Sequence, residues 1–153
     1  METSSTLIGL AILLLFMVPI VFVIIKSSST EKKLKKSLQN LASQNGVTIN
    51  ASEVIGNTLI GLDENVHKLV FSYKNKLTDT FKTVDLSTVN ECRVATFKER
   101  KQPLSRVALE LRSPSATDEI IFYEENDDSS PSTDAEVCLN RANYWKKMIK
   151  QQI

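Results

Sequence analysis

The sequence predicts an α+β protein: an N-terminal transmembrane helix and a juxtamembrane helix, then a small antiparallel β-sheet or open barrel capped by a C-terminal helix. Three observations predict this fold. An uncharged apolar run occupies residues 7–25, strand-like segments begin after residue 50, and residues 133–150 have an amphipathic helical pattern. The 153 residues suffice for a short tail over residues 1–6, the predicted anchor and one domain over residues 51–153.

The apolar run over residues 7–25 contains no charged side chain. At about 1.5 Å per residue, a helix of this length spans roughly 28 Å, close to the hydrocarbon thickness of a bilayer. The alternative is a cleaved signal peptide. Residues 1–6 contain no Lys or Arg and no Ala-x-Ala-like cleavage site follows the run, which favours an uncleaved signal-anchor, although Ser27–Ser29 are small enough for cleavage.

The charges are distributed unevenly along the chain. Residues 1–46 have a net charge of +3 and residues 47–153 a net charge of −2. Lysines that follow the apolar run, with none before it, predict a single-pass inner-membrane protein with its N-terminus outside and its domain in the cytoplasm. The acidic balance of the domain lacks the positive footprint of a nucleic-acid-binding protein, so no nucleic-acid partner is expected.

The segment 26–46 is predicted to form a lysine-rich juxtamembrane helix. Ser28 and Glu31 have the spacing of a capping box, and Gly46 is a typical helix stop. Its lysines are candidate contacts to anionic lipid headgroups, and the alternative is that they only set the topology and stay solvated. These candidate residues are Lys26, Lys32, Lys33, Lys35 and Lys36.

The following residues have the alternation of β-strands. Segments 53–62 and 66–73 are predicted to form a hairpin, because Asp63, Glu64 and Asn65 between them favour a turn. Further strands are expected at residues 81–86, 88–97, 105–112 and 120–123.

The last helix is predicted to begin near Thr133, where Glu136 completes a second capping box. Its apolar residues recur at the spacing that keeps one helix face buried. They are Ala135, Cys138, Leu139, Ala142, Trp145 and Ile149. This pattern predicts that the helix covers one end of the sheet.

Several short motifs carry a resemblance to a family. They are Ile60-Gly61-Leu62-Asp63, Leu69-Val70-Phe71, Val84-Asp85-Leu86-Ser87, Cys92-Arg93-Val94, Leu109-Glu110-Leu111, Ile121-Phe122-Tyr123 and the helix from Ala142 to Trp145. With these motifs the chain resembles uncharacterised single-pass membrane proteins of the Bacteroidetes group that have a pleckstrin-homology-like barrel. The resemblance implies that Trp145 packs into the mouth of a barrel. It implies a fold and a location, and no reaction.

Catalytic, cofactor and metal chemistry are not expected. His67 is the only histidine and has no acid–base partner nearby in the sequence, and Cys92 and Cys138 are expected to be buried, inert thiols. The sequence contains no C-x-x-C, H-E-x-x-H, G-x-S-x-G or phosphate-loop motif. The carboxylates of residues 124–128 lack the glycine and final glutamate of a calcium loop. The chain is therefore predicted to be no enzyme and to need no cofactor.

The preferred hypothesis is a membrane-anchored interaction module whose strand edge or groove recruits a protein partner. One alternative is an accessory single-pass subunit of a larger membrane complex. Another is weak binding to a lipid surface through the basic loop 98–101, while the acidic turn at residues 63–65 argues against phosphoinositide recognition. The last alternative is a periplasmic domain behind a signal peptide. A disulfide between Cys92 and Cys138 would support this alternative.

Overall fold

The structure is a computed structural model that describes residues 2–98, 103–127 and 133–153. Within the first helix, the side chains of residues 2–7, 11, 20 and 23–28 lie outside this description. The chain divides into two compact units, Met1–Lys33 and Leu34–Ile153, and each is described by itself.

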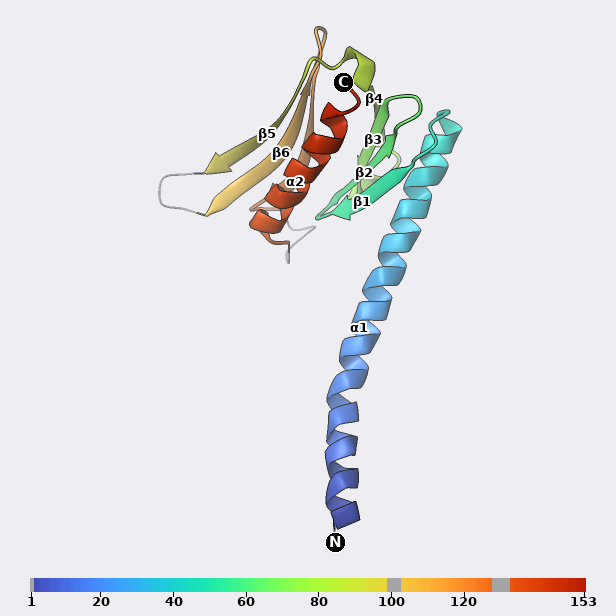
Figure 1. Cartoon of the computed structure of the whole chain (residues 1–153), viewed down its shortest axis with the longest axis vertical. Helices are drawn as coiled ribbons and strands as arrows, with labels where there is room; N and C mark the ends of the chain where they lie inside the picture. Colours follow the sequence, from blue (N-terminus) through green and yellow to red (C-terminus); the bar gives the residue numbers. More distant parts are fainter. Residues whose placement is uncertain (1, 99–102, 128–132) are drawn as a thin grey trace. The chain divides into compact units, whose positions relative to one another are not determined.

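A single helix, α1 (Glu2–Gln44), takes the place of the two helices predicted for this part of the chain (Figure 1). The predicted helix start at Ser28 is not observed. A capping box supplies partners to N–H groups that begin a helix, whereas in an uninterrupted helix the preceding turn already supplies them. No glycine or proline lies between Pro19 and Gly46 to stop the helix.

The predicted transmembrane helix over residues 7–25 is corrected by the structure. A helix needs about 20 consecutive apolar residues to cross a bilayer. Within this segment the described side chains are those of residues 8–10, 12–19 and 21–22, and among all described residues no helix is long and apolar enough to span a membrane. The predictions of a signal-anchor, a single-pass topology and an inner-membrane location depended on this segment and are corrected with it.

The first sheet is antiparallel and has the strand order β1-β2-β3-β4 (Figure 1). Its strands are β1 (Ala51–Ile55), β2 (Thr58–Asp63), β3 (Lys68–Tyr73) and β4 (Lys82–Asp85). The predicted strand 53–62 is in fact two strands, because Gly56 and Asn57 form a two-residue turn inside it. Gly56 has a positive φ of 56°, which glycine adopts without a steric penalty.

The second sheet is antiparallel, with the order β5-β6-β7. Its strands are β5 (Glu91–Lys98), β6 (Leu104–Arg112) and β7 (Thr117–Glu124), and short 3₁₀ turns η1 (Lys74–Lys76) and η2 (Leu86–Thr88) lie in the connections before it. Two sheets therefore replace the predicted single sheet or barrel. The η2 turn redirects the chain between β4 and β5, and the Asp85 carboxylate stabilises this turn by accepting from the Ser87 N–H at 3.0 Å.

The C-terminal helix is α2 (Ala135–Lys150), and its N-cap lies one residue after Thr133, where the sequence predicted it. Asp134 is its N-cap, and its carboxylate accepts from the N–H groups of Glu136 and Val137. The predicted apolar face is buried against the second sheet, and its fully buried members are Cys138, Ala142, Trp145 and Ile149.

Two apolar cores lie on opposite faces of the first sheet. Ile60 and Leu62 of β2 point into the main core, which also includes side chains of the second sheet and of α2. Leu59, which directly precedes Ile60 and therefore points to the opposite face, packs with Leu38 and Ala42 of α1 in a smaller second core. The last turns of α1 therefore belong to the domain and cover the outer face of the first sheet.

Candidate functional site

The candidate site is a groove between strand β1 and helix α2, which we call the β1–α2 groove. Its cavity has a volume of about 230 Å³. It is lined by Lys35, Ala51, Ser52, Glu53, Arg141, Tyr144, Trp145 and Met148. Pockets that bind drug-sized ligands have volumes of about 300–1,000 Å³. This smaller cavity is therefore suited to one or two side chains and not to a whole small molecule.

Glu53 joins the two walls of the groove. Its Oε2 atom accepts a hydrogen bond from Nη2 of Arg141 at 2.5 Å and one from the indole Nε1 of Trp145 at 2.8 Å. The side chain of Glu53 is only 21% exposed, and Trp145 is 1% exposed. A carboxylate that lies this deep needs such donors, since an unpaired buried charge is strongly unfavourable.

The Arg141 guanidinium is held in place by two neighbours. It lies over the ring of Tyr144, with Cζ 4.6 Å from the ring centroid. The hydrogen bond to Glu53 raises the pKa of Arg141 above its already high ordinary value, so this side chain stays charged. Its Nε atom is buried and has no hydrogen-bond partner in the described structure. The groove wall thus contains a fixed cation with one unused donor.

Strand β1 forms an edge of the first sheet, with β2 as its paired neighbour. Ile55 and Thr58 flank a two-residue turn and form the hydrogen-bonded pair nearest to it, so the alternation of an antiparallel ladder places the next such pair at Glu53. The backbone N–H and C=O groups of Ser52 and Val54 therefore point away from β2. Among the described residues no strand pairs with these groups, which form a short unpaired edge beside the groove.

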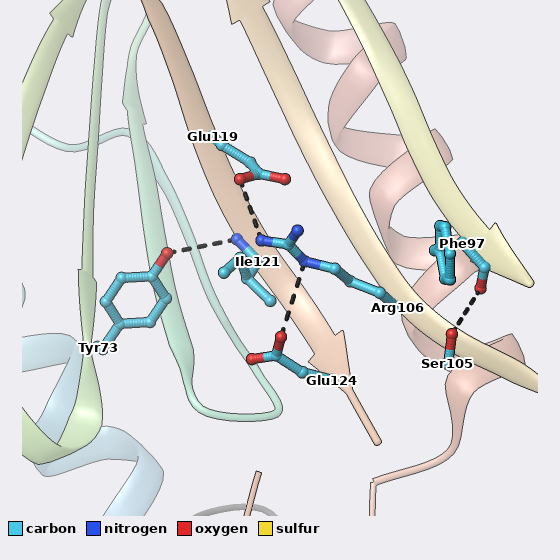
Figure 2. A network of polar contacts seen from close by, with 7 residues as sticks. All are labelled: Tyr73, Phe97, Ser105, Arg106, Glu119, Ile121 and Glu124. Carbon is cyan, nitrogen blue, oxygen red and sulfur yellow. Dashed lines mark hydrogen bonds and ion pairs between the residues drawn. The ribbon is translucent and has the colours of Figure 1, made fainter. Parts of the chain in front are cut away.

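The edge formed by β7 is closed, in contrast to that of β1. Figure 2 shows Tyr73 of β3 extending to Ile121, whose N–H donates to the Tyr73 hydroxyl at 3.3 Å. The hydroxyl of Thr58 donates to the carbonyl oxygen of Ile121. Gly56 completes the closure, because a Cβ atom at this position would lie 2.8 Å from the carbonyl oxygen of Phe122. The first sheet thus covers the centre of β7.

Alternating charges on the second sheet neutralise one another. Arg106 lies between two carboxylates, with Nη2 3.1 Å from Glu119 and Nε 3.9 Å from Glu124 (Figure 2). Arg93 and Glu110 form a further pair across β5 and β6 at 2.7 Å. Such exposed pairs contribute little to stability, and they leave no concentrated charge on this surface.

The structure describes the side chains of four of the five lysines proposed as membrane contacts. Lys32, Lys33 and Lys36 are exposed on α1, and the side chain of Lys26 lies outside the described residues. Only Lys35, which is half-buried, lines the β1–α2 groove. Lipid contact by these residues stays a prediction. The basic loop 98–101 also lies outside the description, apart from Lys98.

The residues considered for catalysis do not form a site. His67 is exposed in the turn before β3, with a positive φ of 50°, and not on a strand as predicted. Cys92 and Cys138 are buried free thiols, as predicted, and burial raises the pKa of each to about 11. Among the described residues, no group of three or more His, Cys, Asp or Glu side chains is placed to hold a metal ion.

Sequence reasoning missed Glu53, Arg141 and Tyr144 as site residues. Arg141 and Tyr144 are three residues apart on one helix face beside the predicted buried Trp145, which is a weak local signal. Nothing local connects Glu53 to them, because Arg141 follows it by 88 residues.

Comparison of the chain with protein-family models, with curated proteins and with solved structures gave no match. The resemblance to pleckstrin-homology-like proteins of the Bacteroidetes group therefore stays a prediction.

Proposed function

We propose that this protein is an interaction module that binds an extended peptide segment of a partner protein along β1, beside α2. The observation that carries the proposal is the open edge of β1 next to a groove walled by a helix. A peptide strand added to a sheet edge gains main-chain hydrogen bonds, and a neighbouring pocket selects its side chains. The role is binding and not catalysis, since the groove carboxylate, Glu53, is already occupied by two donors.

The length of β1 supports this mode. The five residues of β1 extend over about 16 Å, at roughly 3.3 Å per residue, which accommodates a strand of similar length. Tyr144, which is 47% exposed, and Met148 supply apolar surface for a side chain of the added strand. Aromatic residues and methionine are enriched at protein interfaces.

The test begins with a phage-displayed library of random twelve-residue peptides, panned against the full chain. Selected peptides are synthesised, and amide hydrogen exchange of the chain is measured with and without them. Strand addition should slow exchange at Ser52 and Val54, whose N–H groups point outward. Exchange at Glu53, already bonded to β2, should change much less and is the internal control.

Two variants sharpen the test. Ser52→Pro removes one outward N–H group at an edge position that tolerates proline, so it should abolish peptide binding and leave the fold intact. Ser52→Ala keeps the backbone N–H group and should bind like the parent. Failure to select any binding peptide, or protection that appears at β4 or β5 and not at β1, would contradict the proposal.

A further inference from the structure

One flank of helix α2 has an apolar stripe that is open to solvent. Val137, Arg141, Tyr144 and Met148 recur at intervals of four, three and four residues, which places them in one row along the helix. Val137 is 56% exposed and Tyr144 is 47% exposed, while Met148 is half-buried. We call these three apolar residues the α2 stripe. Two of them, Tyr144 and Met148, line the β1–α2 groove, and Val137 extends the stripe toward the start of the helix.

Strand β1 and helix α2 run in opposite directions. Gly56, directly after β1, lies close to Thr133, just before α2. Glu53, at the centre of β1, contacts Arg141 and Trp145 near the middle of the helix. Two residues of β1 extend about 6.6 Å, which equals the rise of about four residues of α2. Alternate residues of β1 are therefore about level with successive members of the α2 stripe: Ala51 with Met148, Glu53 with Tyr144, and Ile55 with Val137.

A strand added to β1 would place alternate side chains over this stripe. Directly opposed residues of neighbouring strands have their side chains on the same face of a sheet. Glu53 contacts α2, and Ala51 and Ile55 point to the same side, into the main core. The three residues of the added strand that oppose them therefore face the helix. The two residues between these three bond to the outward main-chain groups of Ser52 and Val54 and point their side chains away from α2.

The charges beside the stripe already have partners. Arg141 is paired with Glu53. Lys35, the other cation that lines the groove, has an interaction of its own. A charged side chain that faced α2 would lose water without gaining a new partner. An apolar side chain there would instead remove exposed surface of Val137 and Tyr144 from water, which is favourable in proportion to the area covered.

From the exposed stripe and the paired charges beside it, we infer that the partner segment has uncharged apolar side chains at three alternate positions, i, i+2 and i+4, which cover the α2 stripe. The inference rests on the proposed function and specifies the sequence class of its partner. A second copy of β1 does not belong to this class. In the register that uses both outward residues, the Glu53 side chains of two copies would oppose each other, and like charges so placed are destabilising.

The test compares three pools of labelled twelve-residue peptides that have the same composition. Each peptide has three residues drawn from Val, Ile and Phe, seven from Ser, Thr and Gln, and two C-terminal lysines for solubility. The apolar residues are at alternate positions in the first pool, at consecutive positions in the second, and at the helical spacing i, i+4, i+7 in the third. Fluorescence anisotropy measures binding to the full chain. The alternating pool should bind about tenfold more tightly than the consecutive pool, because a strand places at most two of three consecutive side chains on one face.

Variants of the chain assign this preference to the stripe. Val137→Ser removes an exposed apolar side chain and leaves the contacts of Glu53 in place, so it should weaken binding of the alternating pool by about fivefold. Tyr144→Ser should weaken it by about tenfold. Phe97→Ser is the matched control, because Phe97 is 61% exposed on β5 and does not line the groove. This control should bind like the parent, and the fluorescence of Trp145 checks that each variant is folded.

The outcomes separate the inference from the proposed function. Equal binding of the alternating and consecutive pools, with slowed amide exchange at Ser52 and Val54, overturns the inference and leaves strand addition intact. A preference that is unchanged in both the Val137→Ser and Tyr144→Ser variants also overturns the inference, because the apolar residues are then recognised elsewhere. Tightest binding by the helically spaced pool contradicts both proposals. If no pool binds while peptides selected by panning protect β1, only the inference falls, and if panning also fails, both fall.

Discussion

Trp145 donates its indole N–H to the carboxylate of Glu53 over 2.8 Å, and this contact joins the last helix to the first strand. The tryptophan is buried in the main core, so its polar N–H group must find a partner inside the protein. Glu53 supplies that partner and holds Arg141 at the same time. One side chain thus serves the core and the groove.

Replacement of Glu53 separates these two roles. Glu53→Ala leaves the buried indole N–H without an acceptor, and we expect the free energy of unfolding to fall by about 1–3 kcal/mol. Glu53→Gln keeps an oxygen that can accept from Trp145, so it should lower the free energy of unfolding by less than Glu53→Ala does. Urea unfolding followed by the fluorescence of the single tryptophan measures both variants. Equal losses in the two variants would show that the indole hydrogen bond is not the main contribution.

Two glycines with positive φ provide a matched pair. Gly46 and Gly56 have φ values of 71° and 56°, so alanine at either position is strained by about 1–2 kcal/mol. Only at Gly56 would the new Cβ atom also lie 2.8 Å from the carbonyl oxygen of Phe122, whereas at Gly46 no atom lies within 4 Å. Gly56→Ala should therefore lower the melting temperature clearly more than Gly46→Ala. Similar losses would contradict the close approach of the β1–β2 turn to β7.

Asp63 is expected to contribute to stability at neutral pH. Burial opposes its ionisation, but hydrogen bonds from the N–H groups of Thr48, Asn65 and Val66 outweigh this and hold the pKa below 3.8. A carboxyl group with a lowered pKa in the folded state stabilises the fold above its unfolded pKa. This stabilisation is lost as pH falls through the folded pKa.

Asp63→Asn should remove this contribution and replace one acceptor oxygen by a donor. We expect a loss of about 1–3 kcal/mol at pH 7 and a smaller difference from the parent once pH has fallen below the lowered pKa of Asp63. Denaturant titrations of variant and parent at several pH values measure this difference in the free energy of unfolding. Asp85 and Glu110 also have lowered pKa values, so only the difference between variant and parent is informative. A difference that is constant with pH would argue against the role of the charge.

The two thiols should react slowly in the folded protein. Burial raises the pKa of Cys92 and Cys138 from 9.0 to about 11. At pH 8 the thiolate fraction is then roughly a hundredfold lower than in the unfolded chain, and only the thiolate reacts with iodoacetamide. The neutral thiols favour the fold below pH 9, and this contribution is lost as pH rises toward 11.

Mass spectrometry of alkylated protein with and without urea measures this protection. Single variants Cys92→Ser and Cys138→Ser show which thiol reacts. Rapid alkylation of the folded chain at pH 8 would contradict the observed burial.

Local patterns in the sequence were sufficient for much of the domain. The alternation of Val107, Leu109 and Leu111 predicted β6, and the spacing of Cys138 to Ile149 predicted the buried face of α2. These predictions succeeded because each periodicity reports which side of an element is buried. The Gly56-Asn57 pair is a further local signal, since such pairs commonly join hairpin strands, and the single strand predicted over residues 53–62 does not use it.

Features that depend on distant or neighbouring structure could not be predicted in this way. The capping box at Ser28 has a meaning only if the preceding residues are not helical, and in α1 they are. The division into two sheets depends on the η2 turn between β4 and β5, which no periodicity reveals. The groove requires Glu53 to meet side chains of α2, and their separation in sequence hides this contact.

That separation also determines when the groove can exist. Arg141 and Trp145 follow Glu53 by 88 and 92 residues, so on a ribosome β1 is made long before its partners. Contacts between residues so far apart form late and slowly in folding, because a long loop must first be closed. A nascent chain therefore displays the edge of β1 without the helix that builds the binding wall. Ligand capture in the groove would then report that folding is complete, and immature chains would not compete for the same partner.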